Sequence, residues 1–215
     1  MKTDALPIYL DHNASTPVSP EVADAMLPYL RESFGNPSSD HIYGRNLQRA
    51  VAGARIQVAA LIGATADEIV FTSGGTEANN LAIRGIAARL SHKRHIITSQ
   101  IEHPATVEPC RLLGQQGWKV TWLPIDANGR ILVEELATTV DEQTALLTLM
   151  HANSETGTIQ PLAQLSRLAR AAGALIHTDA AQSVGKIPVK VNELDVDLLS
   201  IAGHKLYAPQ GVGAL

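Results

Sequence analysis

The sequence predicts an α/β protein whose central sheet is mainly parallel. Short β-branched or apolar segments bounded by turn residues recur along the chain, and segments with helical spacing of apolar residues lie between them. Because strands and helices alternate, we expect neighbouring strands to run in the same direction. The chain has 215 residues, 45% of them hydrophobic, which is enough for one sizeable core.

Two helices are expected before the first strand. Ser19 is predicted to cap the first helix, with Pro20 in its first turn, and Pro28 is predicted to interrupt and bend it. The second helix is expected to end at Gly63 and to present one apolar face to the protein. That face comprises Leu47, Val51, Ala54, Val58 and Leu61.

Six segments are expected to be buried strands, and a helix is expected to end before Gly173. In open parallel sheets, ligands bind beyond the carboxyl ends of the strands, so polar residues directly after each strand are candidate site residues. The expected strands are EIVFTS from Glu68, HIITSQ from His95, KVTWLP from Lys119, ALLTLM from Ala145, ALIHTD from Ala174 and DLLSIA from Asp197.

Composition excludes several classes of function. The formal charge is −4, from 21 acidic and 17 basic residues, and neither sign forms a long run. The sequence therefore lacks the positively charged surface expected of a protein that binds nucleic acid or an anionic membrane. No leader-like or membrane-spanning stretch is present, so a soluble, cytoplasmic protein is expected. The single cysteine, Cys110, excludes an internal disulfide and a cysteine-built metal site, and the eight histidines form no recognised zinc-ligand spacing.

The turn after the first expected strand, TSGGTEANN, has two interpretations. Gly74 and Gly75 allow a tight turn, and Thr76 opens a helix whose first amide groups are free to bind a phosphate. The same residues also suit an ordinary capped strand-to-helix turn. After the fourth strand, Asn153 and Ser154 are either site residues or turn formers.

Three further side chains follow strands. His103 precedes Pro104 and either caps a helix or contacts a planar ligand and moves a proton. Asp179 ends an apolar strand and needs a cation or hydrogen-bond donors, either in a ligand or in a local amide. Lys205 is either a surface lysine or an amine whose proton affinity is lowered, which makes it nucleophilic toward a carbonyl. Together, a phosphate cradle, an imidazole, an acid and a lysine match the requirements of pyridoxal 5'-phosphate (PLP), with Lys205 carrying the cofactor as a Schiff base.

The chain resembles the NifS and IscS type cysteine desulfurases, within the class V aminotransferase group, from about Ile8 to Leu215. The motifs that carry the resemblance are IYLDHNASTP, FGNPSS, FTSGGTEANN, IEHPA, HANSETGT, HTDAAQSVGK and SIAGHKLYAPQGVGAL. The resemblance implies a three-layer αβα fold, the large domain of fold type I PLP-dependent transferases. The implied reaction removes sulfur from L-cysteine, leaving L-alanine and a persulfide on an enzyme cysteine.

The resemblance also implies a role for each matching residue. Lys205 matches the cofactor-binding lysine, His103 the histidine stacked on the pyridine ring, and Asp179 the acid on the ring nitrogen. The expected phosphate contacts are Gly75, Thr76 and His204; the expected contacts of the phenolic oxygen are Gln182 and Ser154.

Three departures from the family pattern affect this expectation. Ser154 replaces a second asparagine, and Ala202 replaces a serine of the phosphate site. Family members also continue for well over a hundred residues that hold the sulfur-accepting cysteine, a substrate-binding arginine and the small domain. Cys110 is not expected to replace that cysteine, because an apolar helix cysteine is usually a core residue. GVGAL is expected to begin an antiparallel strand of the sheet.

We therefore expect the chain to be a fragment. Residues 1–15 are expected to belong to the small-domain side and residues 16–215 to a truncated PLP-binding large domain, without physiological desulfurase activity. The expected partners of the complete protein are L-cysteine, a second copy in a homodimer, and a sulfur acceptor or iron–sulfur scaffold protein. Selenocysteine lyase, or another class V lyase or aminotransferase, remains the alternative activity, and a non-catalytic remnant that only binds cofactor or partner is the alternative outside enzymes.

Overall fold

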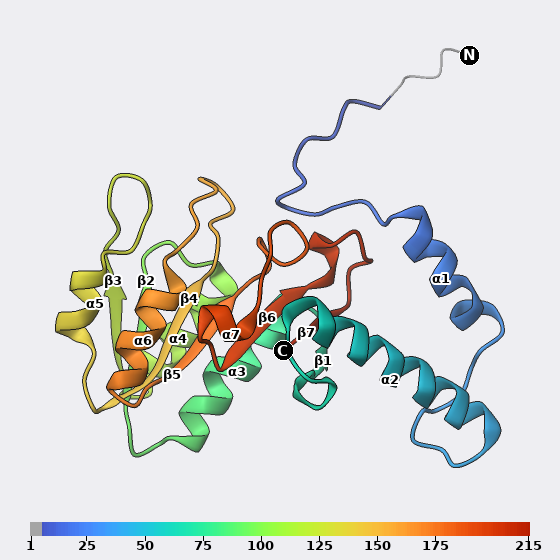
Figure 1. Cartoon of the computed structure of the whole chain (residues 1–215), viewed down its shortest axis with the longest axis horizontal. Coiled ribbons are helices and arrows are strands. Elements are labelled where there is room, and N and C mark those ends of the chain that lie inside the picture. Colours follow the sequence, from blue (N-terminus) through green and yellow to red (C-terminus); the bar gives the residue numbers. More distant parts are fainter. Residues whose placement is uncertain (1–5) are drawn as a thin grey trace.

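The computed structural model describes residues 6–215 and contains a seven-stranded sheet in the order β1-β7-β6-β5-β4-β2-β3 (Figure 1). β7 is antiparallel to β1 and β6, and the other neighbouring strands of the sheet are parallel. The mainly parallel sheet and the antiparallel strand in GVGAL are thus confirmed. The strands are β1 (Phe71–Thr72), β2 (His95–Ser99), β3 (Lys119–Leu123), β4 (Thr144–Met150), β5 (Leu175–Asp179), β6 (Leu198–Ala202) and β7 (Gly213–Ala214).

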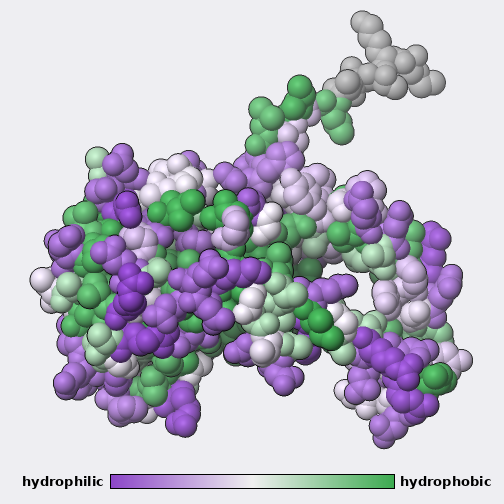
Figure 2. All heavy atoms as spheres, in the orientation of Figure 1, coloured by the Kyte–Doolittle hydropathy of each residue, from purple (hydrophilic) through white to green (hydrophobic). Residues whose placement is uncertain are grey.

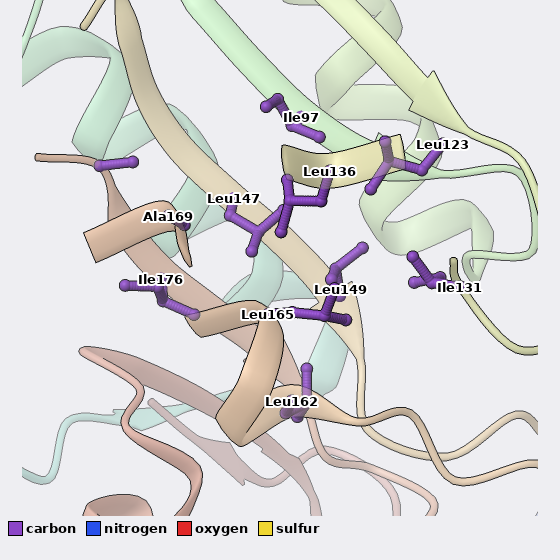
Figure 3. Packing of buried hydrophobic residues seen from close by; sticks show 11 residues of the cluster. Ile97, Leu123, Ile131, Leu136, Leu147, Leu149, Leu162, Leu165, Ala169 and Ile176 are labelled. Atoms are coloured by element: carbon purple, nitrogen blue, oxygen red, sulfur yellow. The ribbon is translucent and has the colours of Figure 1, made fainter. Parts of the chain in front are cut away.

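Helices cover both faces of the sheet. The fold therefore has the three layers, helices, sheet and helices, that the resemblance implies. Neighbouring residues of a strand point to opposite faces, and the core divides accordingly. Ile97 and Leu147 pack with α5 (Val133–Thr139) and α6 (Leu162–Ala171) (Figure 3). Ile96 and Leu146 pack with α3 (Gly75–Arg89) and α4 (Pro104–Gln115) on the other face.

α1 (Pro20–Arg31) and α2 (Ile42–Ile62) extend away from the sheet as an arm (Figures 1 and 2). Ser19 caps α1 as predicted, because its Oγ accepts from the amide of Val22 at 3.2 Å. The helix continues through Pro28, so the predicted interruption there is wrong. The predicted apolar face of α2 is only partly buried, since Val51 is 38% exposed and Leu61 45% exposed.

α2 joins the core at its carboxyl end. Ala59 and Ile62 pack against residues of β6, β7 and the segment after β5. Gly63 ends the helix with φ of 72°, a left-handed conformation that favours glycine. Two short helices lie near the carboxyl end of the chain: α7 (Val191–Leu194) and the 3₁₀ turn η2 (Gly203–Lys205), which follows β6 directly.

The first predicted strand begins later than expected. Residues Ala66–Glu68 form a 3₁₀ turn, η1, and β1 contains only Phe71 and Thr72. The Glu68 carboxylate accepts from the amide of Thr65 at 2.8 Å, which stabilises the turn over an extended chain. The prediction of a buried strand is also wrong for β3, because β3 lies at the edge of the sheet and its Lys119 is exposed.

The predicted division at residue 15 falls partly outside the described residues, because residues 1–5 are not described. From residue 6, the segment before α1 is exposed up to Ala14. The amide of Thr16 then donates to the carbonyl of His204 at 2.8 Å, which anchors this segment to η2.

Candidate functional site

The candidate site lies at the carboxyl ends of the parallel strands. Met150 and Asp179 are paired at the ends of β4 and β5, and Asp179 pairs with Ser200 of β6. α3 and α4 begin just after β1 and β2, so their amino-terminal ends approach the same edge. This edge therefore gathers residues that are far apart in the sequence.

The amino-terminal end of α3 has no side-chain cap. Gly74 occupies the N-cap position with φ of 155°, a conformation that favours glycine, and no protein atom lies within 4 Å of where its Cβ would be. A Cβ on Gly75 would lie 3.2 Å from the Cβ of Ala202, so small residues are required on both elements. The exposed Thr76 follows. Free amide groups beside open space form an anion-binding arrangement.

His103 caps α4 and also lies at the site. Its Nδ1 accepts from the amide of Ala105 at 3.1 Å, which directs the proton of a neutral ring to Nε2. The side chain is exposed. Capping and site placement are thus compatible, because they use different ring nitrogens.

Asp179 is buried at the carboxyl end of β5, with 8% of its surface exposed. Its Oδ1 accepts from the amide of Ala181 at 3.0 Å. Its Oδ2 accepts from Nδ2 of Asn79 at 2.7 Å. Each oxygen retains a further lone pair for a ligand donor.

Lys205 and His204 follow β6 in η2 and are both half-buried. Burial lowers the pKa of the Lys205 amine, and the charge of Lys186 lowers it further, whereas the carboxylates of Asp179 and Asp11 oppose this shift. Burial also lowers the pKa of His204, with additional effects of Lys205 and His103. The Lys205 amine and the His204 ring therefore both bind a proton less tightly than they would in water.

The turn that contains Asn13 covers this group of residues. The Asn13 carbonyl accepts from Nζ of Lys205 and, at 2.9 Å, from Nε2 of Gln182. Its side-chain amide donates to the carbonyl of Ser154 at 2.8 Å. Asn13 thus links the lysine to both residues expected at the phenolic oxygen. The hydroxyl of Ser154 itself donates to Glu155 at 3.2 Å.

Cys110 is a core residue, as expected. It is fully buried in the core beside α3 and β2, and burial raises the pKa of its thiol to about 12. A thiol of this kind is a poor nucleophile near neutral pH. Within residues 6–215, no group of three or more histidine, cysteine, aspartate or glutamate side chains gathers as metal ligands.

Three residues of the site were missed by sequence reasoning. Asn79 lies one helical turn after Gly75, a spacing that could have indicated it. Asn13 contacts Lys205 across 192 positions, and no local pattern indicates such a contact. Glu102 precedes His103 and is 8% exposed; burial raises the pKa of its carboxyl to about 8.

The chain belongs to the class V aminotransferase family, because the aminotransferase class-V model matches residues 8–215. The resemblance to cysteine desulfurases is also confirmed. Cysteine desulfurase IscS of Dictyoglomus turgidum is 52% identical over 97% of the chain and 53% of the relative. The mitochondrial cysteine desulfurase of Drosophila melanogaster is 50% identical over 100% of the chain and 47% of the relative.

Solved structures give the same result. A NifS-like protein superposes with a TM-score of 0.94 at 40% identity, covering 97% of this chain and 58% of the other. The structure of SspA in complex with cysteine gives a TM-score of 0.93 at 42% identity, covering 97% and 60%. The chain thus spans about half the length of the curated relatives it matches. Among residues 6–215, no helix combines the length and apolar character that crossing a bilayer requires.

Proposed function

We propose that the chain is the PLP-binding part of a cysteine desulfurase. The observation that carries this proposal is the meeting of three elements at one sheet edge: the uncapped end of α3, the Asp179 carboxylate and the Lys205 amine. The names of the curated relatives support the same activity.

The donor set fits PLP in chemical terms. The free amides of Gly75 and Thr76 suit its phosphate, and the open space over Gly74 leaves room for it. His204 is the further phosphate contact that the family pattern implies. Asp179 has an oxygen lone pair for the ring nitrogen, and Lys205 has an amine for the aldehyde. Gln182 and Ser154 are the proposed contacts of the phenolic oxygen.

When bound, PLP draws electrons from an amino-acid substrate through its pyridine ring. The chain's own residues prepare this chemistry. The Asp179 carboxylate would accept a hydrogen bond from a protonated ring nitrogen. Because a buried anion is stabilised by hydrogen-bond donors, this contact would favour the protonated form of the ring. The lowered pKa of Lys205 increases the neutral fraction of its amine, the form that attacks a carbonyl. Nε2 of His103 faces no capping amide and is the position from which a proton moves.

L-cysteine is the proposed substrate, and SspA, a structural neighbour, is described in complex with cysteine. A homodimer is proposed because α1 and the segment after it expose large apolar side chains, among them Leu30 at 72% and Phe34 at 71%. A sulfur acceptor or iron–sulfur scaffold protein is the proposed partner. The cytoplasm is the proposed compartment, although one relative at 50% identity is mitochondrial.

A chimera tests the activity directly. The chain would be continued with the remaining part of the Dictyoglomus turgidum relative, and L-alanine formed from L-cysteine would be measured after addition of PLP. We expect PLP-dependent L-alanine formation that Lys205→Ala abolishes. A folded, PLP-binding chimera that releases L-alanine only from selenocysteine would contradict the desulfurase and favour a selenocysteine lyase. Failure to bind PLP would favour a non-catalytic remnant.

A further inference from the structure

Asn79 makes contacts that packing alone does not explain. Its side chain is fully buried on α3, where Ala78, Ala82 and Ile83 are also buried. Its Nδ2 donates to Oδ2 of Asp179 at 2.7 Å and to Oγ1 of Thr106 at 3.2 Å, whereas its Oδ1 has no hydrogen-bond partner. A buried amide with an unpaired acceptor costs free energy that an apolar side chain here would avoid.

The orientation of the amide follows from its neighbour. If the two atoms were exchanged, Oδ1 would face the carboxylate and two acceptors would meet without a hydrogen between them. The donor therefore faces Asp179. Among residues 6–215, Asn79 is the one side chain that donates a hydrogen bond to this carboxylate.

Two donors on different elements determine how the carboxylate lies. The amide of Ala181 holds Oδ1 from the turn after β5, and Asn79 holds Oδ2 from α3. His177, two residues earlier on the same face of β5, bonds Thr148 and Ser200 instead. Without Asn79, Asp179 would keep only the donor from its own turn, and its Oδ2 would be free to rotate.

We propose that Asn79 is a positioning residue that holds the Asp179 carboxylate in the orientation in which it meets the pyridine nitrogen of PLP. This inference rests on the proposed function, because it concerns the same site. Asn79 acts through Asp179 and needs no contact with the cofactor. Its substitution should thus alter the protonation of the ring nitrogen, which loss of packing alone would not.

The test uses the chain loaded with PLP that carries ¹⁵N in its ring. The ¹⁵N chemical shift reports protonation of the ring nitrogen, and fluorescence titration reports PLP affinity. For Asn79→Leu and the smaller Asn79→Ala, we expect the shift to move toward the unprotonated value. The loss of a charge-assisted hydrogen bond should lower PLP affinity roughly tenfold.

Thr178→Val is the matched control. Thr178 is the neighbour of Asp179 on β5, points to the opposite face, is fully buried and has an unpaired hydroxyl. This variant also removes a buried polar group, and we expect the wild-type ¹⁵N shift from it. Circular dichroism of each variant checks folding. The comparison with wild type uses whichever of Asn79→Leu and Asn79→Ala is folded.

The outcomes separate the inference from the proposed function. A wild-type chain that folds but binds no PLP would overturn both. A wild-type chain with a protonated ring nitrogen, together with Asn79 variants of unchanged shift and affinity, would overturn the inference alone. A shift that moves equally in Thr178→Val would also overturn it, because the effect would then follow from any buried substitution near Asp179.

Discussion

Replacing Glu102 by glutamine is expected to change how stability depends on pH. Glu102 is 8% exposed, its Oε1 lies 2.5 Å from Oγ of Ser99, and its Oε2 has no partner. Burial is the main reason that the pKa of its carboxyl rises from 4.5 to about 8. The folded chain therefore keeps this proton across a pH range in which the unfolded chain has lost it.

The magnitude follows from proton linkage. Because the unfolded state binds fewer protons between pH 4.5 and about 8, the free energy of unfolding falls by about 1.4 kcal/mol per pH unit as the pH rises. Over the whole interval this contribution reaches about 5 kcal/mol. Glu102→Gln removes the titrating group, so this part of the slope should disappear.

The assay is urea unfolding of the PLP-free chain, followed by circular dichroism at pH 5, 6, 7 and 8. The slopes of the two proteins are compared, because a glutamine amide without a partner adds a constant cost that does not depend on pH. Glu108→Gln is the control, since the Glu108 side chain is 64% exposed and should leave the slope unchanged. Parallel curves for wild type and Glu102→Gln would refute the reasoning.

Three further predictions concern stability and assembly. Burial lowers the pKa of His177 to about 4, so the free energy of unfolding should fall by up to about 3 kcal/mol between pH 6.5 and 4 as the unfolded state takes up the proton. Urea unfolding of His177→Asn should show a flatter dependence there, and an equal slope would contradict this. Leu30→Asp combined with Phe34→Asp should shift the chain toward monomer in light scattering if the arm forms the dimer contact, whereas an unchanged mass would contradict that contact. Cys110→Ser should cost about 2 kcal/mol by placing a hydroxyl in the core and should leave PLP affinity unchanged; a large loss of affinity at unchanged stability would contradict its role as a core residue.

Much of the fold could be predicted because local signals agree with the tertiary structure. Ser19 and Gly63 mark helix ends through their own chemistry, and the paired apolar residues of β2 and β4 are buried from both faces. The beginning of the first strand could not be predicted, because the Glu68 carboxylate stabilises a 3₁₀ turn and β1 pairs with β7 from the other end of the chain.

The candidate site divides in the same way. His103, Asp179 and Lys205 could be named because each directly follows a strand, and the parallel sheet brings strand ends together. Asn13 and Asn79 act through contacts with residues 192 and 100 positions away. Such contacts depend on the packed structure. The helical spacing from Gly75 could indicate that Asn79 lies near the site, but no pattern in a single sequence identifies its partner Asp179.

The central claim is that Lys205 is the amine that holds PLP. The most direct measurement is borohydride reduction of the PLP-loaded chain, followed by proteolysis and mass spectrometry of the peptides. We expect the cofactor mass on the peptide that contains Lys205, and its absence after Lys205→Ala. Cofactor mass on another lysine such as Lys186, or on no peptide of a folded and PLP-saturated chain, would contradict the account.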